Sequence, residues 1–320
     1  MKQIILDSPK QFKIGIEKAV GVGLEGNFEN VILCGVGGSA MPGILLIDGF
    51  GDELKIPVYI HRSYGLPVQT NEKSLVICLS FSGNTEEAIS SFKNSLKKGL
   101  KPVVITTGGK LKQMAKENSL PCCIIPNDCV QPRFGTGYLF SALVKILSNC
   151  GVLPDKTQEI LSLKENLNPE TFEKKGQELA QKIAHKTPII YSSNNYKSIA
   201  RICKIKFNEN SKIMAFWNYF PELNHNEMCG LTTNNNFFIF ILKDKNDNPQ
   251  VIKRMEITAE LIKEANAGVE IIEMLGKNKL EKMFNTLLLF DWASYYLALA
   301  LGVDPVNVPI VENFKKRLAN

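Results

Sequence analysis

Two glycine- and hydroxyl-rich loops, each placed between an apolar strand pattern and a helical pattern, constrain this chain more than any other feature. The first loop spans 35–40 after the apolar run 31–34, and the second spans 80–87 after the apolar run 75–79. A loop that opens a helix presents backbone N–H groups without intrahelical acceptors, and the helix dipole favours an anion there. Serine and threonine hydroxyls in the second loop add uncharged donors. The pattern therefore predicts an α/β fold with a site for the phosphate group of a small molecule.

The same glycines also fit a dinucleotide-binding site. Gly35, Gly37 and Ala40 satisfy the loose Gly-x-Gly-x-x-Gly/Ala fingerprint of such sites. That site needs an acidic residue near the end of the next strand to hold the ribose hydroxyls. The next apolar strand pattern ends instead in His61 and Arg62. We therefore expect no nicotinamide cofactor, and no other cofactor.

The first part of the chain, residues 1–153, alternates strand and helix patterns with short connections. Its strands are continuous apolar runs, which indicate a buried, mostly parallel sheet. A break with glycine and proline follows, and the charged stretch 156–168 indicates a connection between two domains. The strands are predicted at 30–36, 57–62, 74–80, 102–107 and 122–126. The helices are predicted at 8–22, 39–50, 84–98, 110–118 and 134–150.

Residues 154–320 repeat this order and predict a second domain of the same kind. The fold class that follows is α/β, with two three-layer αβα domains (1–153 and 154–320) whose sheets are mostly parallel. Ligands of such sheets bind at the carboxyl ends of the strands. The strands are predicted at 188–192, 213–218, 237–242 and 269–274. The helices are predicted at 170–185, 196–210, 251–266, 279–301 and 309–319.

Composition and charge argue against two classes of partner. The net charge is +6, from 38 basic and 32 acidic residues. This charge is too small and too dispersed for a nucleic-acid-binding surface. No run reaches the ~18 apolar residues needed to cross a bilayer, and segment 1–7 is too short for a signal peptide. We therefore expect no nucleic acid, no membrane and a cytoplasmic protein.

The eight cysteines and three histidines do not have the spacing of a zinc site. Cys34 and Cys78 lie inside apolar strand patterns, and Cys150 ends a helical pattern. Such thiols are typically small buried apolar groups, and reduced thiols are typical of the cytoplasm. No metal is expected.

A longer set of motifs resembles the sugar isomerase (SIS) fold family. In the first half these motifs are Gly-Gly-Ser at 37–39, Ser-x-Ser-Gly-Asn-Thr-Glu-Glu at 80–87 and Arg-Phe-Gly at 133–135. The second half adds Asn-Glu-Asn at 208–210, Glu-Leu-Asn-His-Asn-Glu at 222–227, Gly-Val-Asp-Pro at 302–305 and Phe-Lys at 314–315. In this order and spacing the set is similar to the bifunctional phosphoglucose/phosphomannose isomerases of archaea and bacteria, over nearly the whole chain.

The resemblance implies an aldose–ketose isomerase of carbohydrate metabolism, acting in glycolysis or gluconeogenesis. It would interconvert fructose 6-phosphate with glucose 6-phosphate and mannose 6-phosphate through a cis-enediol. By matching position, Glu209 would be the base, His225 the ring-opening residue and Lys315 its helper at the ring oxygen. Arg133 would lie beside the developing enediolate. The positions that match substrate and phosphate contacts are Gly37, Gly38, Ser39, Ser80, Ser82 and Thr85.

The resemblance also implies a homodimer, because in this family the ring-opening histidine reaches the site from the neighbouring subunit. That histidine matches His225 here. For the lysine, the run Lys315-Lys316-Arg317 is ordinary decoration of a helix C-terminus, and Lys316 competes for the role.

Other functions stay open at this point. Glucose-specific isomerases carry a glutamine shortly before the lysine, but none occurs between Asp304 and Lys315, and Val308 is nearest by count. The smaller side chain would leave space for the mannose epimer. The alternatives are a sugar-phosphate sensor that keeps the SIS fold without turnover and an isomerase of amino-sugar phosphates.

Overall fold

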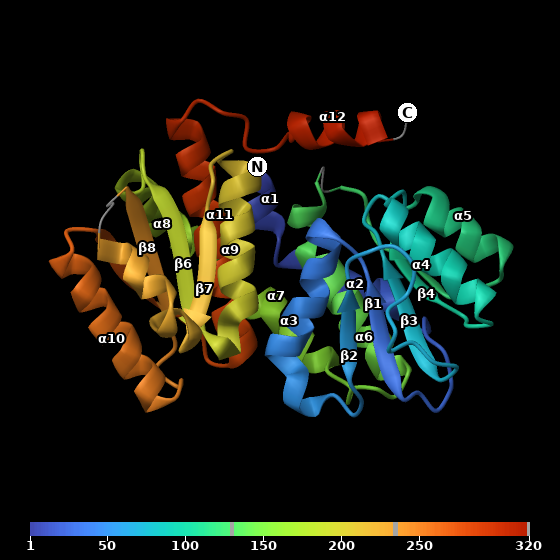
Figure 1. The fold of residues 1–320 in the computed structure, drawn as a ribbon. Helices are drawn as coiled ribbons and strands as arrows, with labels where there is room; N and C mark the ends of the chain where they lie inside the picture. The colour runs from blue at the N-terminus through green and yellow to red at the C-terminus, as the bar shows by residue number, and fades with distance from the viewer. Residues whose placement is uncertain (129–130, 233–235, 319–320) are drawn as a thin grey trace. The chain divides into compact units, whose positions relative to one another are not determined.

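The computed structural model describes residues 1–128, 131–232 and 236–318, so Cys129 lies outside the described residues. Contacts divide the chain into two compact units (Figure 1). Residues 7–167 form the N-terminal unit, and residues 168–320 together with 1–6 form the C-terminal unit. The sequence predicts a boundary between two domains at 153/154. As a boundary between independently folding domains, it stays a prediction.

The N-terminal unit contains a five-stranded sheet in the order β2-β1-β3-β4-β5, and every pairing in it is parallel. The central strands β1 and β3 are buried along their whole length, as their continuous apolar runs predict. The strands are β1 (Asn30–Cys34), β2 (Val58–His61), β3 (Ser74–Leu79), β4 (Val103–Thr106) and β5 (Cys122–Ile124).

Helices cover both faces of this sheet, which gives three layers (Figure 1). On one face α4 and α5 bury Phe92 and Leu111 against side chains of β1, β3 and β4. On the other face α2, α3 and α6 pack together. The helices are α2 (Lys10–Ala19), α3 (Met41–Phe50), α4 (Glu86–Lys97), α5 (Gly109–Glu117), α6 (Thr136–Asn149) and α7 (Thr157–Asn166).

The C-terminal unit repeats this design with a four-stranded parallel sheet in the order β7-β6-β8-β9. Met255 and Ile262 of α10 pack on one face, while Phe207 of α9 and Phe290 of α11 pack with Phe240 on the other. The strands are β6 (Thr187–Ser193), β7 (Phe216–Phe220), β8 (Phe237–Lys243) and β9 (Gly268–Glu273). The helices are α1 (Lys2–Asp7), α8 (Glu173–Lys182), α9 (Lys197–Asn210), α10 (Pro249–Glu264), α11 (Lys279–Ala300) and α12 (Pro309–Leu318).

The predicted α/β class with two three-layer, parallel-sheet units is confirmed, and two local predictions are wrong. The stretch 156–168 contains helix α7, which buries Ile160 and Leu163 and packs against α2. The strand predicted at 213–218 begins only at Phe216, and the Ile213 carbonyl before it accepts a hydrogen bond from the Asn208 side chain (2.8 Å). Among the described residues, no helix is both long and apolar enough to cross a membrane.

Candidate functional site

The glycine loop forms a short 3-10 turn, Gly37–Ala40, directly after the carboxyl end of β1. Gly37 has a left-handed backbone (φ +55), which glycine adopts without strain. Gly38 lies against the segment that carries Arg133. A Cβ at Gly38 would lie 2.9 Å from the Pro132 Cβ and 3.1 Å from the Arg133 backbone N. Only glycine lets these two segments, far apart in sequence, approach this closely.

The Ser39 side chain joins the glycine loop to the second predicted loop. Its hydroxyl is buried and accepts a hydrogen bond from the Phe81 backbone N–H at 3.0 Å. The Phe81 ring in turn packs against Gly135, where a Cβ would lie 2.6 Å from the ring. The structure therefore brings together the three first-half motifs that the sequence singled out, at the carboxyl edge of the N-terminal sheet.

The serine loop is shaped by its own hydroxyls. The buried Ser80 hydroxyl accepts from the Gly83 backbone N–H (3.0 Å) and shares a hydrogen bond with the Thr85 hydroxyl (2.8 Å). Gly83 is left-handed (φ +70), and a Cβ there would lie 1.9 Å from the Gly108 carbonyl oxygen. Ser39 and Ser80 thus hold the loops in shape.

The groups left to face a ligand come from the tip of the serine loop. Ser82 is exposed, Thr85 is half-buried, and Thr85 is the N-cap of α4 without using its side chain as a cap. The first N–H groups of a helix have no intrahelical acceptor and attract an anion. Arg133 adds a cation beside Gly38; it is only 4% exposed, and its guanidinium lies 4.3 Å from the Phe134 ring centre. The edge is suited to an anion such as a phosphate monoester.

In the C-terminal unit, Glu209 lies in the last turn of α9 and is half-buried. The end of this helix is fixed to α11. Asn210 Nδ2 donates to Ser294 Oγ (2.9 Å), and Ser211 Oγ donates to the Ser294 carbonyl (2.7 Å). The backbone immediately after Glu209 is therefore held by buried polar contacts.

His225 ends the 3-10 turn Glu222–His225 and is exposed. The segment that follows is tied to the sheet by Glu227, which accepts from the Tyr191 hydroxyl (2.7 Å) and from Asn218 Nδ2. Burial, and then the neighbouring Glu227 carboxylate, raise the pKa of Tyr191. Glu227 closes the motif at 222–227, and the motif by itself indicates no role for it. A glutamate two residues from the candidate histidine is the signal that could have suggested one.

Glu209 lies at the amino ends of the strands of the C-terminal sheet, and His225 lies at their carboxyl ends. Strands β6 and β7 are parallel neighbours, so α9 must carry the chain from the carboxyl end of β6 back to the amino end of β7. Glu209 precedes β7 and His225 follows it. The five residues of β7 alone span about 17 Å at ~3.3 Å per residue.

The candidate lysines lie on α12, none of whose residues is buried. Lys315 Nζ contacts the Glu312 carboxylate at 3.1 Å, an exposed pair of the kind that contributes little to stability. Lys316 lies on the same helix and is also exposed, so the choice between the two lysines stays a prediction.

Within the described residues, no three His, Cys, Asp or Glu side chains cluster as ligands of a metal ion would. Cys34, Cys78 and Cys150 are buried, as predicted. Burial raises the pKa of the Cys150 thiol, which makes it a poor metal ligand or nucleophile.

Comparisons with known proteins show which family the chain is similar to. A family profile described as the bacterial phospho-glucose isomerase C-terminal SIS domain matches residues 172–318. A bifunctional phosphoglucose/phosphomannose isomerase of Caldicellulosiruptor bescii is 38% identical over 97% of this chain and 95% of its own length. A D-glucosamine-6-phosphate 4-epimerase of Sulfolobus acidocaldarius is 31% identical over 91% of this chain and 90% of its own length.

Among solved structures, the chain is similar to the C-terminal domain of glucosamine-fructose-6-phosphate aminotransferase from Francisella tularensis. The TM-score is 0.74, with 96% of this chain and 98% of that chain covered. The sequence identity is 15%, so this similarity concerns the fold alone.

Proposed function

Because this chain belongs to the family of bifunctional phosphoglucose/phosphomannose isomerases and is thus a sugar-phosphate isomerase, we propose that it interconverts fructose 6-phosphate with glucose 6-phosphate and mannose 6-phosphate. The observation that carries this proposal is the convergence of the glycine loop, the serine loop and Arg133 at one edge of the N-terminal sheet. Neutral hydroxyls, helix N–H groups and one buried cation suit a sugar phosphate.

We assign the proton transfer to Glu209. Its carboxylate would remove the proton from C2 of the open-chain aldose, the C–H electron pair would form the C1=C2 bond, and the C1=O π pair would move onto O1 to give a cis-enediolate. The same carboxyl group would then return the proton to C1, while the proton of the C2 hydroxyl passes to O1 and the C2 oxygen becomes the ketone. Arg133 would stabilise the negative charge that develops on the oxygens. The hydrogen moves within the substrate, so the reaction requires no cofactor.

We assign ring opening to His225, which would pass a proton at the ring oxygen, with Lys315 as its helper. His225 is exposed and lies at the opposite end of the strands from Glu209. This separation favours a site completed by a second copy of the chain. The unpaired edge of β7, with Phe216 47% exposed, is a surface that a partner subunit would cover. The proposed assembly is a homodimer in the cytoplasm.

Acceptance of mannose 6-phosphate rests on the residue that stands nearest to the glutamine of glucose-specific isomerases. That residue is Val308, which is buried just before α12. A valine leaves more room beside C2 than a glutamine, so we propose that either configuration at C2 is accepted.

An amino-sugar phosphate is the second candidate substrate, because the Sulfolobus acidocaldarius relative carries the name of a glucosamine-6-phosphate enzyme. A sensor without turnover is disfavoured, because a sensor needs the phosphate-binding loops but not the set formed by Glu209, His225 and Lys315.

Assays of the purified protein test the proposal. Glucose 6-phosphate and mannose 6-phosphate would each be supplied, and fructose 6-phosphate formation would be measured with a coupling enzyme. Glucosamine 6-phosphate would be supplied separately and its conversion followed by chromatography, because rearrangement of an amino sugar keeps the nitrogen and does not yield fructose 6-phosphate. We expect turnover of the first two. Turnover of glucosamine 6-phosphate alone would favour the second candidate, and binding without turnover would favour the sensor.

A further inference from the structure

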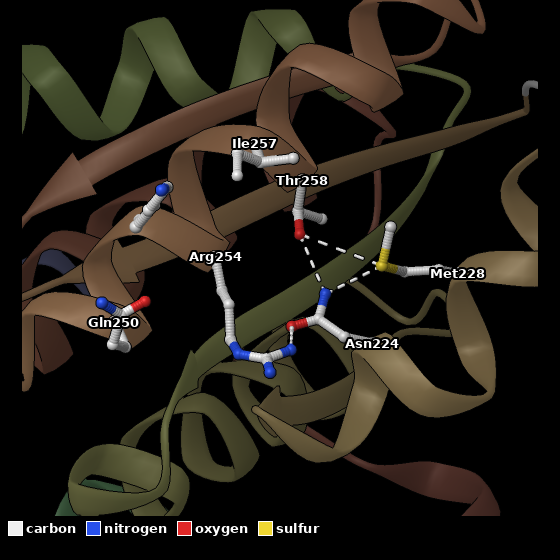
Figure 2. Close-up of a pocket in the computed structure, with 7 residues that line it drawn as sticks. Asn224, Met228, Gln250, Arg254, Ile257 and Thr258 are labelled. Carbon is white, nitrogen blue, oxygen red and sulfur yellow. Dashed lines mark hydrogen bonds between the residues drawn. The ribbon is translucent and has the colours of Figure 1, made fainter.

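A pocket of about 340 Å³ lies in the C-terminal unit, between α10 and the segment that carries His225 (Figure 2). None of the described side chains that line it carries a carboxylate, and two carry a positive charge. The lining residues are Asn224, Met228, Gln250, Lys253, Arg254, Ile257 and Thr258. The volume falls in the range of small-ligand pockets.

Two hydrogen-bond donors on the floor of the pocket, on Asn224 and Thr258, are directed at the thioether sulfur of Met228. Asn224 Nδ2 donates to Thr258 Oγ1 (3.0 Å), and its other contact is the Met228 sulfur (2.8 Å). The Thr258 hydroxyl, in a residue that is 1% exposed, has the same sulfur as its acceptor at 4.0 Å. A thioether is a weak acceptor. The buried hydroxyl proton is therefore available to a stronger acceptor.

The rim of the pocket supplies positive charge. Arg254 donates from Nη1 to Asn224 Oδ1 at 3.3 Å, a long hydrogen bond, and its guanidinium makes no other hydrogen bond to the described residues. Within the described part of the chain, the Lys253 ammonium has no hydrogen-bond or ion-pair partner. Ile257 and Met228 add an apolar wall. These groups together suit a small oxyanion with a short apolar portion.

We propose that this pocket binds a small oxyanion, a carboxylate or a phosphate group, and that the bound anion fixes the turn that carries His225. Asn224 immediately precedes His225 and bonds to both Arg254 and Thr258 (Figure 2), so a ligand held by Arg254 and Thr258 restrains Asn224 as well. The consequence for ring opening rests on the proposed role of His225. The binding itself does not.

Hydrogen exchange of the 222–228 amides, with and without inorganic phosphate or malonate, tests the proposal. We expect one or both anions to slow exchange in this segment, and the more effective one to identify the preferred group. Lys253→Gln and Arg254→Gln, made as separate variants, should each raise the anion concentration needed for half-maximal slowing by at least ~10-fold. Each substitution removes a charged donor. Lys263→Gln is the matched control, because Lys263 is an exposed lysine of the same helix outside the pocket.

A further variant tests the pocket without changing Lys253 or Arg254. Gln250→Glu places a carboxylate on the lining and should also weaken the effect by repulsion. Phosphate binding at the serine loop would slow exchange near 80–87 and leave 222–228 unchanged. The proposal would be overturned if no anion slowed exchange at 222–228. It would also be overturned if the Lys253 and Arg254 variants showed the same slowing as the unmodified protein. Hydrogen exchange at 222–228 and at 80–87 is measured without isomerase turnover. Failure of the proposed function is therefore recognised separately.

Discussion

Glu209 and His225, sixteen positions apart in the sequence, lie at opposite ends of the strands of the same parallel sheet. Glu209 ends α9 on the amino side of β7, and His225 follows the carboxyl end of that strand. Side chains separated by the length of a strand do not meet on one proton-transfer path. Two copies of the chain related by a two-fold axis remove this difficulty, because each can lend its histidine to the other.

Mixing two inactive variants tests this sharing. Glu209→Gln and His225→Ala proteins would be refolded together, and activity would be compared with that of each variant refolded alone. We expect mixed dimers to regain one working site of two. Subunit exchange would be verified with differently tagged chains. Absence of regained activity despite exchange would mean that each chain builds its own site.

The base is tested by Glu209→Gln alone. The amide keeps the shape of the side chain but cannot accept a proton, so kcat should fall by at least ~10² while substrate binding persists. Glu264→Gln is a control, because Glu264 is exposed at the end of α10 and has no role in the proposed reaction. Retention of more than about a tenth of the activity of the unmodified protein would remove Glu209 from the role.

The anion loop is tested by Gly83→Ala against Gly99→Ala. Both glycines are left-handed (φ +70 and +75), so alanine costs about 1–2 kcal/mol at either position. At Gly83 the added methyl also meets the Gly108 carbonyl at 1.9 Å, whereas at Gly99 nothing lies within 4 Å. We expect only Gly83→Ala to raise KM for the sugar phosphate, by roughly tenfold or more. Equal KM values for the two variants would contradict this account of the loop.

The buried ion pair of the C-terminal unit predicts a pH dependence of stability. Lys282 Nζ lies 2.6 Å from Asp244 Oδ1, with both side chains 5% exposed. Burial alone would raise the pKa of Asp244, but hydrogen bonds from Lys282 and Tyr196 outweigh it and hold that pKa below its usual value. Stability from this carboxylate is therefore present above its unfolded pKa and is lost as pH falls through the folded one.

Removal of the cation by Lys282→Met should cost about 3–5 kcal/mol at neutral pH, since it leaves Asp244 buried and unpaired. The deficit relative to the unmodified protein should shrink as pH falls, because protonation removes the buried charge that Lys282 no longer compensates. Urea unfolding at several pH values measures this deficit, with Lys277→Met as the exposed control. A deficit that does not change with pH would show that packing, not charge, is lost.

Activity should not depend on a metal ion. The proposed route moves one proton by a carboxylate and stabilises charge with Arg133, so no step needs a Lewis acid. Isomerase turnover would be measured before and after dialysis against EDTA, with a metal-free coupling system. Loss of activity that a divalent ion restores would place the reaction in another class of isomerase.

The sequence by itself determined the fold class and the positions of the glycine and serine loops. Short continuous apolar runs in alternation with helical patterns are typical of central parallel strands, and β1 and β3 lie where their patterns predict. Glycine at Gly83 is required locally, because its backbone is left-handed. In contrast, α7 was missed because its two buried side chains, Ile160 and Leu163, give too short a pattern to indicate a helix.

Only the tertiary structure decided which of these residues meet. Arg133 lies next to Gly38 because β1 and the turn after β5 both end at the carboxyl edge of one sheet, a closeness that sequence separation conceals. Glu209 and His225 are close in sequence but separated in space, because a parallel pair of strands requires a crossover helix between them. Sequence spacing reports distance along the chain, whereas strand order and direction set the distance between side chains.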